Sequence, residues 1–289
     1  MTDRLSIRRV GVIGAGVMGR GVAQAIAQAG YSVVLTDVSE THLDAARAGI
    51  REAVRFHKLL AGNQTTNRPP EEVIASILFT TDRAPLGEVD YVVENVTERW
   101  GDKEPVYRML DAVCPPSCIL AANTSAIPIT QIAAATRRPS RVVGMHFMNP
   151  VPIRPAVEVI RGYHTSEETL QVSIDLLASM GKKSIVVNDA PGFVSNRVLM
   201  LAINEALFLL QEQVATAEDI DRIFKECVGH RMGPLETADL IGLDTILLSL
   251  EVLFGQFNDP KFRPCPLLRR FVAAGLHGRK SGRGIFSYS

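Results

Sequence analysis

His146 and Glu158 are two side chains whose types and spacing suggest proton transfer. His146 ends the apolar segment RVVGM, and Glu158 follows twelve residues later on a second strand-like segment. The connection NPVPIRPA is too short for a helical crossover, so we expect two antiparallel neighbours that bring the side chains together. An imidazole titrates near neutral pH, and an adjacent carboxylate would orient it and stabilise its protonated form. The pair could serve as the base in an alcohol oxidation, and a structural histidine satisfied by its own strand is the alternative.

A glycine-rich turn near the N-terminus indicates a dinucleotide site. Gly14, Gly16 and Gly19 follow one strand-like run in the pattern GxGxxG, and Asp37 ends the next run. Such glycines permit a tight turn and let a pyrophosphate approach the N-terminus of a helix. Asp37 is expected to accept hydrogen bonds from both ribose hydroxyls. Because its carboxylate would repel a 2'-phosphate and no basic residue follows directly, we predict NAD and not NADP; glycines that only shape a turn are the alternative.

The elements that must position these residues alternate between strands and helices up to residue 188. This alternation predicts an α/β fold with a Rossmann-type, doubly wound sheet, which the short connection after His146 makes mixed. Strands are expected near residues 9–13, 32–36, 78–81, 90–94, 118–122, 141–147, 156–160 and 184–188. Helices are expected near residues 17–29, 39–61, 71–77, 102–113, 129–135, 167–180, 194–212, 217–228, 234–254 and 265–275.

Strand signals end at DAPGF, residues 189–193. We therefore predict two domains: 1–188, a nucleotide-binding domain with a helical hairpin insertion at 39–77, and 189–289, which is all-helical. The segments VLMLAINEALFLL and LIGLDTILLSLEVLF of the second domain carry more apolar surface than a small bundle readily buries. Burial of the excess against a second copy of the chain predicts a homodimer.

Composition describes an ordinary globular protein. The 289 residues are 46% hydrophobic and 21% charged, which excludes disordered and fibrous classes. Lys plus Arg and Asp plus Glu both number 31, so neither nucleic acid nor an anionic membrane is an expected partner. The N-terminal segment has no apolar signal region, and the apolar run at 198–210 is too short to span a membrane.

The cysteines indicate a reducing compartment. They are too scattered for a zinc site, and a chain of this length does not need disulfides, so we expect free thiols, no bound metal and a cytoplasmic location. The four are Cys114, Cys118, Cys227 and Cys265.

A basic stripe lies along the helix expected at 39–61. Its members are spaced by four, four and three residues, which places them on one helix face. They are Arg47, Arg51, Arg55 and Lys58. The stripe is either an anion-binding site or simply a solvated face.

Several blocks occur in the order typical of the L-3-hydroxyacyl-CoA dehydrogenase family, which the chain resembles over nearly its whole length. They are GAGVMG with Asp37, ENVTERWGDK, NTSAIPIT, GMHFMNPVP with VEVIRG, DAPGFVSNR, MGPLETADLIGLD and GRKSGRGIF. The resemblance implies a nucleotide-binding domain followed by a helical dimerisation domain. It also implies oxidation of a 3-hydroxyacyl thioester to the 3-oxoacyl form with NAD.

The resemblance assigns roles to individual residues. His146 corresponds to the catalytic base and Glu158 to the carboxylate that orients it, while Ser125 and Asn196 match residues that contact the reacting oxygens of the substrate. A hydroxyl and an amide can both donate to an oxygen on which charge develops, although Ser125 also suits a turn and Asn196 a helix cap. Further cofactor contacts are implied for Glu98, Lys103, Asn149 and Lys280. For Lys103, pairing with an acid on a solvated helix face is the alternative.

The carrier of the thioester is left open by the sequence. In the family, the helical hairpin holds coenzyme A, but the basic stripe suits the acidic helix of an acyl carrier protein equally well. Arg154 and Pro155 stand where the family has Met-Lys, and Ala126 replaces a usual serine. The blocks HFMNPVP, CVGHRMGPLETADLIGLDTIL and FNDPKFRPCPLLRRFVAAGLHGRKSG resemble a polyketide-pathway subgroup, which oxidises a glyceryl group on an acyl carrier protein to make hydroxymalonyl or methoxymalonyl units. A non-catalytic NAD-binding protein on the same fold is a further alternative, against which the intact site residues argue.

Overall fold

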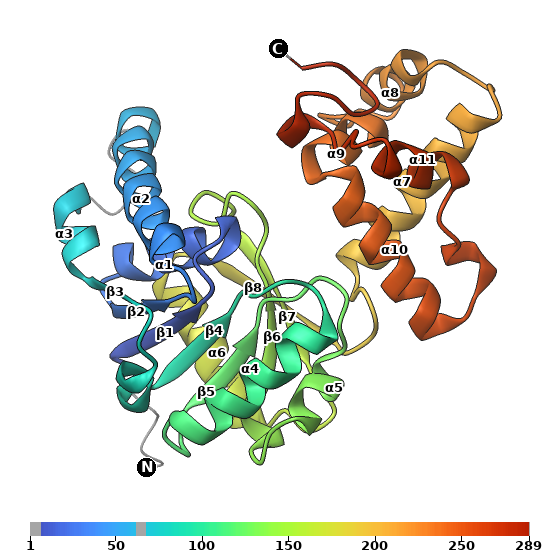
Figure 1. The fold of residues 1–289 in the computed structure, drawn as a ribbon. Coiled ribbons are helices and arrows are strands. Elements are labelled where there is room, and N and C mark those ends of the chain that lie inside the picture. The colour runs from blue at the N-terminus through green and yellow to red at the C-terminus, as the bar shows by residue number, and fades with distance from the viewer. Residues whose placement is uncertain (1–6, 62–67, 289) are drawn as a thin grey trace. The chain divides into compact units, whose positions relative to one another are not determined.

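The computed structural model describes residues 7–61 and 68–288, except for the side chains of 57–61. Within it the chain forms two compact units, Met1–Asp189 and Ala190–Ser289. Each unit has its own hydrophobic core. The first unit is a sheet flanked by helices, and the second is built from helices (Figure 1). The predicted α/β fold class is confirmed.

The sheet of the first unit has eight strands in the order β3-β2-β1-β4-β5-β6-β7-β8. Neighbouring strands pair in parallel, except for the antiparallel pair of β6 and β7, as the short connection between them predicted. The strands are β1 (Arg9–Ile13), β2 (Ser32–Thr36), β3 (Ile77–Thr80), β4 (Tyr91–Glu94), β5 (Ile119–Ala122), β6 (Val142–His146), β7 (Ala156–Arg161) and β8 (Lys183–Asn188). The parallel strands β1, β2, β4, β5 and β6 all end at one edge of the sheet, where open α/β sheets bind ligands.

Helices cover both faces of this sheet, which explains why its central strands β1, β4 and β5 are buried along almost their whole length. They are α1 (Val17–Gln28), α2 (Glu40–Ala61), α3 (Pro70–Ala75), α4 (Trp100–Val113), α5 (Ile129–Ala134) and α6 (Glu167–Ser179), with short 3-10 turns η2 (Ala84–Glu88) and η3 (Pro139–Arg141). Ser166 begins α6 as an N-cap, because its side chain accepts a hydrogen bond from the Thr169 backbone N–H at 3.1 Å.

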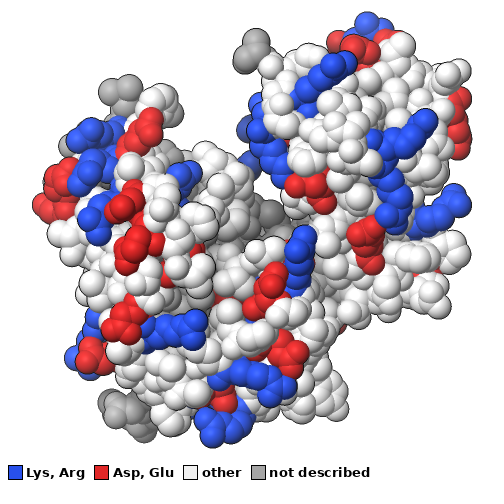
Figure 2. Space-filling model, in the orientation of Figure 1, with Lys and Arg blue, Asp and Glu red and all other residues white. Residues whose placement is uncertain are grey.

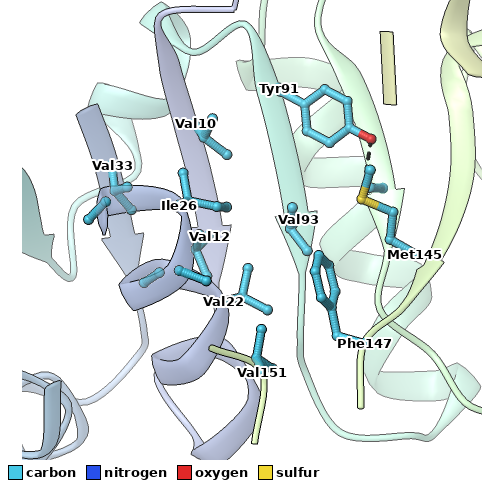
Figure 3. Close-up of a cluster of buried hydrophobic side chains, with 14 of the residues drawn as sticks. Val10, Val12, Val22, Ile26, Val33, Tyr91, Val93, Met145, Phe147 and Val151 are labelled. Carbon is cyan, nitrogen blue, oxygen red and sulfur yellow. Dashed lines mark hydrogen bonds between the residues drawn. The ribbon is translucent and has the colours of Figure 1, made fainter. Parts of the chain in front are cut away.

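The core on the α1 and α6 face holds the end of β6 in place. Met145 and Phe147 are buried in this core, beside Tyr91 and Val93 of β4 (Figure 3). Because side chains alternate along a strand, these two anchors direct the intervening His146 toward the opposite face. Position 146 is therefore fixed by apolar packing on both of its neighbours.

The second unit is a helical bundle around a core to which α7, α8, α9, α10 and α11 all contribute. Its helices are α7 (Ser195–Gln211), α8 (Ala217–Glu226), α9 (Pro234–Ile241), α10 (Leu243–Phe257) and α11 (Pro266–Ala273), with 3-10 turns η4 (Pro260–Phe262) and η5 (Arg279–Ser281). Asn204 interrupts the apolar sequence of α7, and its buried side chain donates to the Arg263 carbonyl and accepts from the Cys265 N–H. This polar residue therefore ties the helix to the segment before α11.

The prediction of a single helix over 234–254 is wrong, because the structure forms two helices there. Gly242 separates α9 from α10 at a φ of 106°, a conformation that an L side chain rarely adopts. The axes of the two helices differ by 97°. Within the described residues no single helix combines the length and apolar character of a membrane span, and this bent pair meets those criteria by length and composition alone.

Candidate active site

The antiparallel register of β6 and β7 sets His146 directly opposite Glu158. Their side chains are 6% and 9% exposed, and His146 Nδ1 lies 3.1 Å from Glu158 Oε2. A carboxylate only accepts, so Nδ1 carries the hydrogen and the Nε2 lone pair is left for other chemistry. Ser125 Oγ is 3.2 Å from Nε2. The imidazole is thus held between a carboxylate and a hydroxyl, an arrangement suited to a general base.

Two asparagines connect the ends of the three strands around this imidazole. Asn123 follows β5, and its side-chain oxygen accepts from the N–H of Phe147 at 3.1 Å. Its amide nitrogen donates to the side-chain oxygen of Asn95, which follows β4, at 2.7 Å. Sequence reasoning missed both residues, although an asparagine directly after each of two neighbouring strands is a usable signal. They fix the backbone next to His146.

The glycine turn has the geometry that a dinucleotide requires. Gly14 has a φ of 90°, and a Cβ on Gly19 would lie 1.8 Å from the Gly14 carbonyl oxygen, so neither position accepts a larger residue. Gly16 is the N-cap of α1, and a Cβ there would meet no atom within 4 Å. The space beside Gly16 and the N–H groups at the start of α1 fit a pyrophosphate.

Asp37 lies at the end of β2 beside this turn. Its Oδ2 accepts from the Ala15 N–H at 2.7 Å, and its Oδ1 accepts from the Ser39 N–H at 3.1 Å and lies 3.0 Å from His42 Nδ1. Burial by itself raises the pKa of Asp37, but the hydrogen bonds from Ala15, His42 and Ser39 outweigh it, and the net pKa is lowered. Asp37 is therefore ionised at neutral pH, as contact with ribose hydroxyls requires.

Glu98 organises the loop that carries Ser125. Its Oε1 accepts from the Thr124 hydroxyl and from the N–H groups of Ser125 and Ala126, both at 2.9 Å. The Ile127 N–H is 3.4 Å from the same oxygen. One carboxylate therefore shapes four consecutive residues, and the position of the Ser125 hydroxyl depends on it.

Lys103 lies beneath Glu98 and is wholly buried. Its Nζ lies 3.0 Å from both carboxylate oxygens of Glu94 and 3.8 Å from Glu98 Oε2. Burial raises the pKa of Glu94 despite the adjacent ammonium group. The alternative placed Lys103 in an ion pair on a solvated helix face. It was right about an acidic partner and wrong about the solvated face, because Lys103 is wholly buried where it meets Glu94 at the end of β4. A buried ammonium group has no surface with which to touch a cofactor, so we assign Lys103 to holding Glu94 and Glu98.

The other three residues predicted to contact substrate or cofactor are Asn149, Asn196 and Lys280, and they lie on different parts of the chain. Asn149 follows β6 and is exposed, and its carbonyl accepts from Arg154 Nε at 3.2 Å. Asn196 and Lys280 belong to the second unit: the former is half-buried in the first turn of α7, and the latter pairs with Asp244 at 2.6 Å. Their roles toward substrate and cofactor stay predictions.

The positive charge of the basic stripe on α2 is partly neutralised by an acidic residue of α3. Arg51 donates to Glu71 from Nε and Nη2 at 3.1 and 3.2 Å, and Arg55 lies 4.0 Å from the same carboxylate. Arg47 lies over the ring of Phe79, 4.7 Å from its centroid. The side chain of Lys58 lies outside the described residues. Basic and acidic side chains accordingly mix over α2 and α3 (Figure 2), and the anion site stays a prediction.

Comparison with known proteins identifies the family. Residues 9–190 match the family profile "3-hydroxyacyl-CoA dehydrogenase, NAD binding domain", and residues 192–288 match the profile of its C-terminal domain. A "Probable 3-hydroxybutyryl-CoA dehydrogenase" of Bacillus subtilis is 47% identical over 288 residues, with 98% of each chain covered. The 3-hydroxybutyryl-CoA dehydrogenase of Bradyrhizobium diazoefficiens is 43% identical, over 98% of this chain and 96% of that one. The crystal structure of (S)-3-hydroxybutyryl-CoA dehydrogenase from Ralstonia eutropha superposes with a TM-score of 0.91 at 42% identity, covering 98% of this chain and 100% of that one. With both profiles matched in order, the chain belongs to the 3-hydroxyacyl-CoA dehydrogenase family, as its ordered motifs predicted.

Proposed function

We propose that the protein oxidises the hydroxyl group of a 3-hydroxyacyl-CoA to the 3-oxo group with NAD. The observation that carries this proposal is the buried His146–Glu158 pair, which lies at the same sheet edge as the glycine turn and Asp37. NAD, when bound there, supplies the acceptor for the hydride that leaves the substrate carbon. The chain itself contributes binding, orientation and proton transfer.

His146 takes the proton of the substrate hydroxyl on Nε2 as the carbon loses its hydride, so the alcohol gives one proton to the imidazole and one hydride, with its two electrons, to NAD. Glu158 keeps Nδ1 protonated and stabilises the imidazolium that results. Ser125 Oγ, 3.2 Å from Nε2, can donate to the substrate oxygen and hold it next to the base. Asn196 is proposed as a second donor to the reacting oxygens.

Coenzyme A is the proposed carrier because the relatives described above are named for 3-hydroxybutyryl-CoA. We propose that the stripe at Arg47, Arg51 and Arg55 attracts its phosphates. Replacing both Arg51 and Arg55 by Ala is expected to raise the KM for acetoacetyl-CoA more than it lowers kcat. Arg108→Ala, which removes an exposed arginine of α4, is the matched control. If the double variant differs from wild type only in solubility, the stripe is a solvated face.

The activity is tested in the reverse direction by following NADH fluorescence with acetoacetyl-CoA. We expect saturable oxidation of NADH. Normal NADH binding without turnover would refute the proposal and would leave two outcomes for a second assay. Turnover with a glyceryl-loaded acyl carrier protein would show that the same residues act on a substrate held by that carrier. No turnover there would indicate a non-catalytic NAD-binding protein.

We also propose that the protein is a cytoplasmic homodimer. The second unit exposes Val198 on α7 and Leu240 on α9 at 65% and 50%, and apolar residues this exposed are available for burial against a second copy. All four cysteines are free thiols, which suits a reducing compartment. Sedimentation at micromolar concentration tests the dimer, and a monomer there would refute it.

A further inference from the structure

Lys182 is a buried lysine whose charge no carboxylate balances within the described part of the chain. It lies between α6 and β8, and its side chain is 6% exposed. Its Nζ donates to the carbonyl of Val151 at 2.7 Å and to that of Arg154 at 2.9 Å. Burial lowers the pKa of this ammonium group. Since burying a charge is unfavourable unless it is well bonded, the two carbonyls are what hold Lys182 in place.

Both carbonyls belong to the loop that joins His146 to Glu158. The loop forms a single helical turn, because the N–H groups of Ile153 and Arg154 donate to the Pro150 carbonyl at 3.3 and 3.2 Å. A carbonyl inside such a turn has no strand partner, and the ammonium group supplies the missing donor. Lys182 therefore clamps this turn from the side of β8.

The opposite side of the turn packs on α1. Val151 is 2% exposed and lies beside Val22, as Figure 3 shows. A Cβ on Gly21 would lie 3.1 Å from Val151 Cβ, so the backbone of α1 is in close contact with the turn. Arg154 Nε in turn donates to the carbonyl of Asn149 at 3.2 Å. A shift of the turn would consequently be transmitted both to α1 and to Asn149.

We propose that Lys182 is a positioning residue for NAD binding, which clamps the turn at 150–154 and so fixes Asn149, which lies directly before this turn and follows β6. The inference rests on the NAD-binding part of the proposed function and on the prediction from the family resemblance that Asn149 contacts the cofactor. Lys182 itself touches neither substrate nor cofactor. Its removal should therefore weaken cofactor binding and leave the proton-transfer step intact.

The test is Lys182→Met, measured by fluorescence titration with NADH on protein shown to be folded by circular dichroism. We expect the Kd for NADH to rise by up to about tenfold, because the loss of a hydrogen bond to a charged group sets the upper limit for an effect that reaches the cofactor only through Asn149. The KM for NAD should rise in parallel, and kcat at saturating NAD should stay within about threefold of wild type. If this variant does not fold, Lys182→Gln keeps an N–H donor group on a shorter, uncharged side chain and should also raise the Kd.

Two controls separate positioning from general destabilisation. Lys183→Met removes the exposed neighbouring side chain and keeps the backbone hydrogen bond from Lys183 N–H to the Pro155 carbonyl, so its Kd should equal that of wild type. Leu176→Ala creates a cavity in the core beneath α6, and should lower the melting temperature without changing the Kd.

A double-mutant cycle with Asn149→Ala tests whether Lys182 affects NADH binding through Asn149. If Lys182 acts through Asn149, the double variant binds NADH no more weakly than the weaker single variant. Additive losses, or a folded Lys182→Met protein with the wild-type Kd, would overturn the inference. Wild-type protein that binds NADH but does not reduce acetoacetyl-CoA would overturn the proposed function and leave this inference standing.

Discussion

Replacing Glu158 by Gln tests the pairing on which the proposed chemistry depends. A glutamine oxygen can still accept the hydrogen of His146 Nδ1, so the variant keeps the ring orientation and removes only the negative charge. Two unit charges about 4 Å apart attract by about 4 kcal/mol at an effective dielectric constant of about 20. A hydrogen bond to a charged group contributes about 1.5 kcal/mol or more. These bounds predict a fall in kcat between about 10-fold and 10³-fold, since about 1.4 kcal/mol corresponds to each tenfold change.

The assay is kcat at saturating NAD and 3-hydroxybutyryl-CoA, together with the Kd for NADH. The Kd should not change, because Glu158 contacts the imidazole and not the glycine turn. Glu158→Ala should lower kcat further, since it removes the orienting acceptor as well as the charge. Glu167→Gln is the matched control, because it neutralises an exposed carboxylate that pairs with Arg161 on the same strand as Glu158. A Glu158→Gln protein with kcat within about twofold of wild type would refute the role assigned to the carboxylate.

Three other outcomes are expected. His146→Gln should lower kcat at least about 10²-fold with an unchanged Kd for NADH, and retained turnover would reject His146 as the base. Asp37→Ala should raise the Kd for NADH by about tenfold or more, which the same titration measures, and it should also lower the melting temperature because the N–H groups of Ala15 and Ser39 lose their acceptor. Burial raises the pKa of Asp111, but hydrogen bonds from Arg137 and Arg138 outweigh it and the net pKa is lowered. The wild-type protein should therefore be more stable than Asp111→Asn. This difference in the free energy of unfolding should be complete above a pH of about 4, the pKa of Asp111 in the unfolded chain, and should be lost as the pH falls through the lower pKa of the folded state. Urea unfolding between about pH 7 and 3 measures it.

The sheet was predictable from sequence because its strands are short apolar runs separated by helical periods. The strand expected near 78–81 is β3 at Ile77–Thr80, a shift of one residue. The prediction of one long helix over 234–254 was wrong because of a single residue. A glycine inside an apolar helical pattern is usually tolerated, and only the structure shows that Gly242 adopts positive φ and turns the chain by 97°.

The dyad was predictable for a different reason. A connection too short for a helix forces antiparallel pairing, and twelve residues of separation then allow His146 and Glu158 to face one another. The roles of Glu98 and Lys103 were not predictable in the same way. They depend on how deeply Lys103, in the first turn of α4, is buried and on which carboxylates it meets there. Sequence periodicity does not predict how deeply a helix is buried.

Charged side chains hold the Ser125 loop through Glu98, whose carboxylate accepts from the backbone of the loop. Lys103 Nζ lies between the carboxylates of Glu94 and Glu98, and the loop N–H groups of Ser125 and Ala126 donate to Glu98. Breaking a buried pair is unfavourable chiefly because it strands the remaining charge. Loss of Lys103 would leave two carboxylates facing one another beneath the loop, whereas loss of Glu94 would leave a lysine that still has Glu98. Of Lys103 and Glu94, the ammonium group is therefore the one on which the position of Glu98, and through Glu98 that of the Ser125 hydroxyl, depends more.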